Sequence, residues 1–254
     1  MYGHQHEQRT MEHFSLSPNG KYMALRGSSR KGGGVINILD TRTLQWSTQV
    51  RIESRGGVAD FAWWGNGNGM SIAGKNGEVT EWSVDEGVVG RWNDEGAVGT
   101  TVIALGGSSG RHDWIGGDRW VAIGSSSGVV NIYDRRAWSE GAEDALLSSN
   151  GGLPKAPKPL RALGNLTTPT SHLAFSPDGQ ILAMASRWKN NAMRLVHLPS
   201  ATVFKNWPTE KTPLGRITAV AWGRPTEEEE REGSLAQIAV ANESGHIRLW
   251  EVRA

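Results

Sequence analysis

Apolar and polar residues alternate with a period of two along many short stretches of the chain, as they do in β-strands that are buried on one face. Two stretches, Phe14 to Leu25 and Leu173 to Met184, repeat one another closely. Each carries Ser-Pro-Asn-Gly or Ser-Pro-Asp-Gly between two apolar runs. That tetrapeptide is typical of a tight turn in which glycine takes a positive φ. The pattern therefore predicts two copies of a strand–turn–strand unit.

Looser copies of the same unit recur along the chain at intervals of about 40 to 50 residues. Further copies of its first strand lie at 58–63, 101–105 and 217–222. A third strand follows each copy, at 35–40, 78–83, 129–134, 193–198 and 246–251. We therefore expect five repeats of one β unit.

A repeat of strand, turn, strand, glycine-containing turn and a strand that ends in Trp-Asp or a variant is the WD-repeat pattern. It predicts an all-β protein, a WD-repeat β-propeller of four-stranded blades. We expect blades at about 11–53, 56–93, 97–165, 168–208 and 214–254, after a short polar leader or remnant of a preceding blade at 1–10. The fifth repeat stops after its third strand. We therefore expect the C-terminal part of a seven-bladed ring rather than an autonomous five-bladed one.

Composition agrees with a turn-dense β protein and excludes several other classes. The 254 residues include 33 Gly and 12 Trp but no Cys, and 27 basic residues balance 26 acidic ones. Without thiols the chain forms neither a disulfide scaffold nor a Cys-ligated metal site. The longest apolar stretches, such as 181–185 and 236–241, are far shorter than a membrane-spanning helix. We expect a soluble intracellular protein.

No motif in the chain predicts catalysis, so we expect no enzyme, no cofactor and no metal. The glycine-rich stretches at 65–69 and 106–111 lack the Lys-Ser/Thr ending of a phosphate loop, and we expect both to be turns between strands. The seven histidines are scattered. His112 and Asp113 beside Arg111 suggest a general base, but adjacent residues rarely face one substrate, so a surface position is the better interpretation.

Two polar insertions interrupt the repeats. Residues 227–232, Glu-Glu-Glu-Glu-Arg-Glu, are expected to form a solvated loop, with an acidic contact for a basic partner as the alternative. Residues 139–159 are rich in Gly, Pro and Ser, and we expect them not to pack. Their lysines are candidates for contact with a phosphate backbone.

The turns between second and third strands, together with the connections between blades, share one face of a propeller. Their charges sum to only +2 (+4 in the turns, −2 in the connections), too weak to predict a nucleic-acid surface. The best local patch surrounds Trp188, which either anchors a partner or folds back onto a neighbouring blade. The candidate partner-binding residues are Arg187, Trp188, Lys189, Asn190, Arg30, Lys31 and Lys75. Trp63, Trp82, Trp222 and Trp250 lie on strands and are expected to fill the space between blades.

Three segments, 165–169, 182–199 and 202–215, go beyond a generic repeat and resemble the WD-repeat U3 small nucleolar RNA-associated protein family of the small-subunit processome. The resemblance covers nearly all of 11–254. It implies a non-catalytic scaffold in the nucleus and nucleolus that works in U3-dependent processing of pre-18S ribosomal RNA.

The implied partners are the other WD-repeat and helical-repeat subunits of the UTP-B subcomplex, with U3 RNA and pre-ribosomal RNA in the same assembly. The resemblance implies no membrane and no small-molecule substrate. The family has an N-terminal extension that recruits a helicase, and we expect no counterpart of it in these residues. The alternative is a peptide-docking WD-repeat adaptor of a ubiquitin-ligase or signalling complex.

Overall fold

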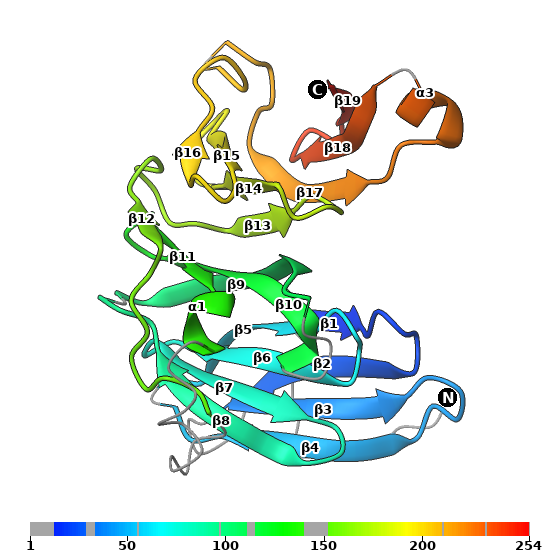
Figure 1. The fold of residues 1–254 in the computed structure, drawn as a ribbon, viewed down its shortest axis with the longest axis vertical. Helices are drawn as coiled ribbons and strands as arrows, with labels where there is room; N and C mark the ends of the chain where they lie inside the picture. Colours follow the sequence, from blue (N-terminus) through cyan, green and yellow to red (C-terminus); the bar gives the residue numbers. More distant parts are fainter. Residues whose placement is uncertain are drawn as a thin grey trace. The chain divides into compact units, whose positions relative to one another are not determined.

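The computed structural model describes residues 13–28, 34–54, 56–96, 98–110, 115–139, 152–209, 211–231 and 233–253. Within these ranges the chain forms antiparallel β-sheets joined by turns, with helical turns η1 (Ile115–Gly117), α1 (Arg136–Ser139) and α3 (Glu227–Arg231). It divides into two compact units, the first with strands β1 to β8 and the second with the sheets from β9 to β19 (Figure 1).

The first unit contains two four-stranded sheets whose strands follow one another in chain order. The strands of the first sheet are β1 (His13–Leu16), β2 (Tyr22–Ser28), β3 (Gly34–Asp40) and β4 (Trp46–Ile52). Those of the second are β5 (Val58–Trp63), β6 (Gly69–Gly74), β7 (Glu78–Ser83) and β8 (Gly87–Asn93). A cluster of buried apolar side chains from both sheets, which includes Ala24, Ile36, Ile72 and Trp82, forms part of the core of this unit.

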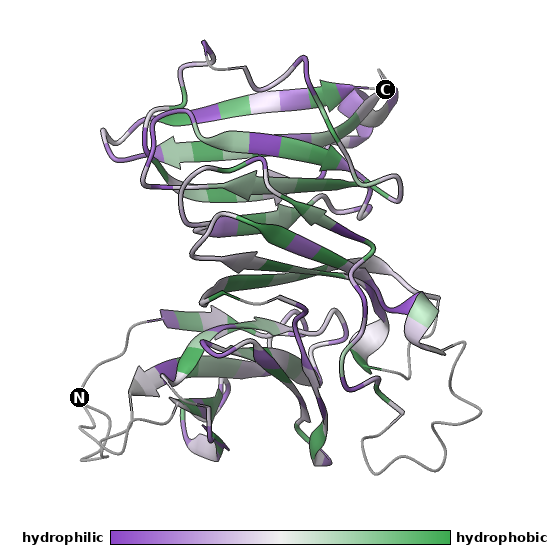
Figure 2. Ribbon diagram, turned by 90° about the vertical axis from the view of Figure 1, so that its left-hand side faces the viewer, coloured by the Kyte–Doolittle hydropathy of each residue, from purple (hydrophilic) through white to green (hydrophobic). Residues whose placement is uncertain are grey.

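The second unit contains three sheets, each of which also keeps chain order. The first has β9 (Thr100–Ser108), β10 (Asp118–Ser125), β11 (Val130–Asp134) and β12 (Arg161–Leu163). The next has β13 (His172–Phe175), β14 (Ile181–Ala185), β15 (Met193–His197) and β16 (Thr202–Val203), and the last has β17 (Ile217–Gly223), β18 (Ser234–Asn242) and β19 (Ile247–Arg253). One apolar cluster joins the first two sheets and another joins the last two. In Figure 2 the strands carry most of the hydrophobic positions.

These sheets confirm the predicted all-β class with four-stranded blades. Each is a meander of antiparallel strands, as in a propeller blade. The last sheet has three strands within the described residues rather than four. No helix in those ranges is long and apolar enough to cross a bilayer.

The two Ser-Pro-Asx-Gly turns have the same hydrogen bonds. In the first, the Ser17 hydroxyl donates to the Asn19 side chain at 2.7 Å, and Gly20 N donates to Ser17 O at 2.8 Å. In the second, the Ser176 hydroxyl donates to Asp178 at 2.5 Å, and Gly179 N donates to Ser176 O at 2.8 Å. Both glycines have positive φ, 70° and 72°. The sequence repeat is therefore a repeat of atomic structure.

Two predicted inter-blade tryptophans also occupy equivalent positions. Trp63 on β5 donates its ring N–H to Ser15 O on β1 at 3.2 Å. Trp222 on β17 donates to Ala174 O on β13 at 2.9 Å. Each indole therefore ties the first strand of its sheet to the first strand of the preceding sheet. Trp82 is buried in the core of the first unit, and Trp250 packs on the apolar cluster between the last two sheets of the second.

The predicted loop at 227–232 is wrong over the residues that the structure describes, because Glu227–Arg231 form helix α3. Thr226 and Glu229 explain the difference. The Thr226 backbone N donates to a Glu229 carboxylate oxygen at 2.7 Å, and Glu229 N donates back to the Thr226 hydroxyl at 3.4 Å. This is a capping box, which satisfies the free N–H groups at the start of a helix. Gln237 on β18 donates to the same carboxylate group at 2.7 Å and holds the helix against the sheet.

Two further predictions need correction. The glycine-rich stretch at 106–111 is a turn only in its later part, because β9 continues through Gly106 and Gly107 to Ser108. The predicted unpacked stretch, 139–159, lies outside the described residues at 140–151. In its described part the prediction is wrong, because Leu153 and Pro157 are buried and Lys155 O accepts the backbone N–H of Asn93 at 2.8 Å. Buried apolar side chains and a backbone hydrogen bond thus hold this Gly/Pro-rich segment on the first unit.

Candidate protein-docking surface

The turn between β14 and β15 carries the strongest of the predicted contact residues. Residues 187–190 are all exposed, and Trp188 keeps 61 % of its surface accessible. The Arg187 guanidinium carbon lies 5.4 Å from the centre of the Trp188 ring, within the range of a cation–π contact. Trp188 does not fold back onto a neighbouring sheet, so the alternative interpretation of this residue is wrong.

Hydrogen bonds fix both ends of this turn. On one side, Arg187 N donates to the Ser171 hydroxyl at 2.8 Å, and the Thr168 hydroxyl donates to Ser186 at 2.6 Å. On the other side, the Asn191 side chain accepts the backbone N–H of Gly215 at 2.8 Å, and Asn191 N donates to Gly215 O at 2.8 Å. The connections that precede and follow this sheet therefore hold the turn in place. The backbone on both sides of Trp188 is fixed by hydrogen bonds.

His172 links the base of the turn to the next sheet. Its Nε2 lies 2.8 Å from Thr218 O on β17, and its Nδ1 lies 2.8 Å from the Ser171 hydroxyl that holds Arg187. Burial lowers the pKa of His172; the bond to Thr218 opposes this, and the nearby charge of Arg187 adds to it. The imidazole is therefore held in its neutral form at physiological pH.

The remaining predicted residues fall elsewhere. Lys75 lies exposed in the β6–β7 turn of the first unit, where its backbone N donates to Gly57 O at 3.1 Å. Lys75 thus lies in the turn between the second and third strands of its sheet, as Trp188 does in its own sheet. Arg30 and Lys31 lie outside the described residues, as do Arg111, His112 and Asp113. The structure therefore brings together Arg187, Trp188, Lys189 and Asn190, and places Lys75 in the other unit.

The equivalent turn of the next sheet, between β18 and β19, carries an acidic residue, Glu243. Its carboxylate lies 3.7 Å from the Arg216 guanidinium. Both side chains are more than half exposed, so the attraction between them is weak. The Trp188 turn presents an aromatic residue between two cationic ones, Arg187 and Lys189. Tryptophan and arginine are common at the centres of protein interfaces.

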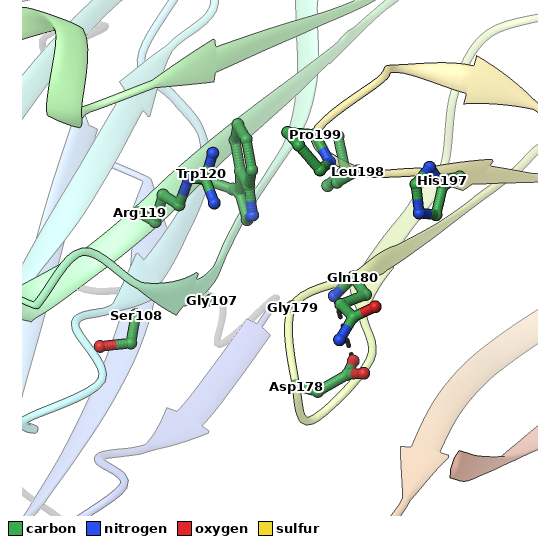
Figure 3. A pocket seen from close by; sticks show the side chains of 10 residues that line it. All are labelled: Gly107, Ser108, Arg119, Trp120, Asp178, Gly179, Gln180, His197, Leu198 and Pro199. Carbon is green, nitrogen blue, oxygen red and sulfur yellow. Dashed lines mark hydrogen bonds between the residues drawn. The ribbon is translucent and has the colours of Figure 1, made fainter. Parts of the chain in front are cut away.

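A hollow of about 350 Å³ opens at the opposite end of the same sheet (Figure 3). Trp120 and Pro199 face it from opposite sides, and Asp178, Gln180 and His197 complete its wall. The Arg119 guanidinium lies 3.9 Å from the centre of the Trp120 ring and bonds Asp134 at 3.0 Å. Sequence reasoning missed this hollow because its lining comes from separate segments of two sheets.

Asp134 pairs with Arg119, the arginine that lines this hollow. Burial acts to raise the pKa of Asp134, but hydrogen bonds from Arg136 and Arg119 outweigh it and hold that pKa below its usual value. The carboxylate therefore stays charged and paired. Within the described part of the chain, no group of three or more His, Asp or Glu side chains could hold a metal ion.

Comparison with known proteins identifies close relatives. The chain is 39 % identical over 253 residues to the probable U3 small nucleolar RNA-associated protein 18 of Schizosaccharomyces pombe, covering 99 % of this chain and 41 % of the relative. It is 40 % identical over 271 residues to U3 small nucleolar RNA-associated protein 18 of Saccharomyces cerevisiae, with coverages of 99 % and 42 %. The Mus musculus homologue is 33 % identical over 248 residues, with coverages of 97 % and 38 %. The chain thus spans about two fifths of the length of these curated relatives.

No protein-family model matches the chain. Among solved structures, a chain in the crystal structure of the mitotic checkpoint complex superposes with a TM-score of 0.61 at 14 % identity, covering 94 % of this chain and 62 % of the other. At this identity the likeness shows the fold alone, which is that of a WD-type β-propeller.

Proposed function

We infer the function of this chain from the family to which it belongs, that of U3 small nucleolar RNA-associated protein 18 and its homologues. We propose that it serves in ribosome biogenesis as a non-catalytic scaffold subunit of the small-subunit processome, which uses U3 RNA in the processing of pre-18S ribosomal RNA. Its place of action is then the nucleus, and within it the nucleolus. The names of the relatives support the U3-associated role, and the propeller fold supports a scaffold that works through its turns.

The proposed partners are the other WD-repeat and helical-repeat subunits of the UTP-B subcomplex. The observation that carries this part is Trp188, 61 % exposed on a turn that is fixed at both ends. An exposed aromatic ring on a rigid base loses little conformational entropy when a partner covers it. Tryptophan and arginine are also the residues whose truncation most often weakens protein interfaces.

The triple variant Arg187→Ala, Trp188→Ala, Lys189→Ala tests this proposal. We expect it to reduce recovery of processome subunits from nuclear extract at least tenfold, since truncating an interface hot spot costs roughly 2 kcal/mol or more. The measurement is affinity purification of the tagged chain, with mass spectrometry of bound proteins and sequencing of bound RNA. Arg161→Ala, an exposed basic residue on β12, is the control and should leave recovery unchanged.

Thermal melting of each purified variant separates lost docking from lost folding. Unchanged recovery with the triple variant would reject the Trp188 surface. Recovery of ubiquitin-ligase or signalling components by the unmodified chain, without pre-ribosomal RNA, would replace the scaffold proposal with the peptide-docking adaptor.

A further inference from the structure

The outer strand of the sheet that carries Trp188 is unusually short. β15 has five residues, but β16 has two, which pair with Val196 and His197. One more ladder bond follows, from Phe204 N to Leu195 O at 2.9 Å, and the chain then leaves the sheet as a long connection to β17 (Figure 1). A hollow of about 390 Å³ lies between Arg194 on β15 and the chain that follows β16.

The lining of this hollow is basic and aromatic. Among the described residues that form it, Arg194 and Lys205 are cationic and none is acidic. Phe204 supplies an aromatic ring, and Asn165 an amide with both donor and acceptor groups. These groups come from three segments: the start of the connection that follows β12, β15 and the chain after β16.

The wall of the hollow is held in place by contacts behind it. Phe204 and Trp207 pack against the apolar cluster between the last two sheets, and the Trp207 ring lies 5.3 Å from that of Trp250. The Arg194 guanidinium donates to Met193 O at 2.8 Å, which fixes its head at the edge of β15. Phe204 and Arg194 are therefore positioned before any ligand arrives, which lowers the entropy cost of binding.

We propose that this hollow binds one nucleotide of a single-stranded RNA, with the phosphate at Arg194 and Lys205, the base against Phe204 and the base edge at Asn165. Single-stranded nucleic acids are recognised by this combination of cations along the backbone and aromatic rings under the bases. The volume falls within the range of about 300–1,000 Å³ typical of small-ligand sites. A phosphorylated peptide would also satisfy the cations, but RNA offers a flat base to Phe204 and a base edge to Asn165 within the same nucleotide as the phosphate.

The proposed RNA contact goes beyond the proposed function. Only the choice of RNA rather than DNA as the ligand rests on that function. A direct test measures the fluorescence anisotropy of a labelled uridine decamer with the whole purified chain, across about 50 to 200 mM salt. We expect Lys205→Ala and Arg194→Ala each to weaken binding roughly threefold to tenfold, and the two changes together to reduce the salt slope by about 0.7, the contribution of one phosphate. Phe204→Leu keeps an apolar side chain at the cluster and should weaken binding about fivefold or more while the slope stays the same.

The matched control is Arg224→Ala, which removes one exposed cation of the same unit, in the connection between β17 and α3. It should leave RNA affinity unchanged. The Trp188 docking surface is tested by a separate measurement, recovery of bound proteins, so failure of one proposal is distinct from failure of the other. Lys205 is exposed, and its variant carries the test if Arg194→Ala does not fold. Equal affinity for the unmodified chain and Lys205→Ala would overturn the site, as would no binding by either. Tighter binding of DNA of the same sequence, or of a phosphoserine peptide that displaces the RNA, would overturn the choice of ligand.

Discussion

Glu81 is a carboxylate with no exposed surface, in the middle of β7. It accepts hydrogen bonds from the Trp64 indole at 3.0 Å, the Trp92 indole at 2.9 Å and the Ser71 hydroxyl at 2.5 Å. Burying a charge is costly unless it is fully hydrogen-bonded. Glu81 thus accepts hydrogen bonds from three buried donor groups. Trp64 and Trp92 each contribute one of these donors, which gives both tryptophans a role in the packing of this sheet.

Replacing Glu81 with Ala should therefore destabilise the first unit strongly. The variant leaves two indole N–H groups and a hydroxyl buried without this acceptor, at a cost of about 3 kcal/mol or more in the free energy of unfolding. Urea unfolding followed by tryptophan fluorescence measures the change. Glu78→Ala, a half-exposed residue of the same strand, is the control and should change stability by less than about 0.5 kcal/mol. A similarly small loss for Glu81→Ala would show that the network contributes little.

His172 gives the second unit a dependence on pH. Because burial and Arg187 lower its pKa in the folded chain, the unfolded chain binds the proton more tightly than the folded one does. The stability contributed by neutral His172 is fully present above the unfolded pKa of about 6.5 and is lost as pH falls through the lowered folded value.

Urea unfolding at a series of pH values below neutral tests this dependence. The unmodified chain should lose stability as pH falls below about 6.5, and His172→Gln should lose less over the same interval. His197→Gln, on another strand of the same sheet, serves as the reference variant. If His172→Gln follows the unmodified chain at every pH, the imidazole is not the group responsible.

At the scale of elements, the two Ser-Pro-Asx-Gly turns share their hydrogen bonds but differ in the atoms that surround their glycines. A Cβ on Gly20 would have no atom within 4 Å, whereas one on Gly179 would lie 2.3 Å from the Gly107 Cα. Both positions have positive φ, so alanine is strained in each. The second turn carries an additional constraint, since the end of β9 lies against it.

The pair Gly20→Ala and Gly179→Ala separates these two costs. We expect Gly20→Ala to lower the free energy of unfolding by about 1 to 2 kcal/mol from backbone strain alone. Gly179→Ala should cost at least about 1 kcal/mol more, since backbone atoms of β9 must also move. Chemical unfolding of both variants measures the difference. An equal loss of unfolding free energy in the two variants would show that the backbone of β9 moves away from the methyl group added by Gly179→Ala without a measurable cost.

The sequence could predict the elements whose pattern lies within one short segment, but not the features formed by segments distant in sequence. The alternation around 14–25 and 173–184 and the turn tetrapeptides predicted strands, turns and repeat correctly, because those signals are local. The capping box at Thr226 and Glu229 was equally local and could have revealed α3. The hollows beside Trp120 and Arg194 could not be predicted, because their linings come from segments distant in sequence.

For the whole molecule, the sequence indicated blades but not which faces are covered. β19 shows why: Ile247 and Leu249 point to one side and Trp250 and Val252 to the other, so both sides are apolar. In the structure Trp250 and Val252 pack on the preceding sheet, while Ile247 and Leu249 remain 74 % and 62 % exposed. Period-two alternation identifies a strand, but burial of its faces follows only from the packing of neighbouring sheets.

The indole bonds of Trp63 to Ser15 O and of Trp222 to Ala174 O have a consequence for how such a chain lengthens. Each acceptor is a backbone carbonyl, which every residue supplies, so the preceding sheet needs no special side chain. A duplicated gene segment encoding one sheet with its tryptophan would therefore bring its own means of attachment. At each new junction, growth by whole repeats would then need this tryptophan together with the apolar side chains that pack the two sheets.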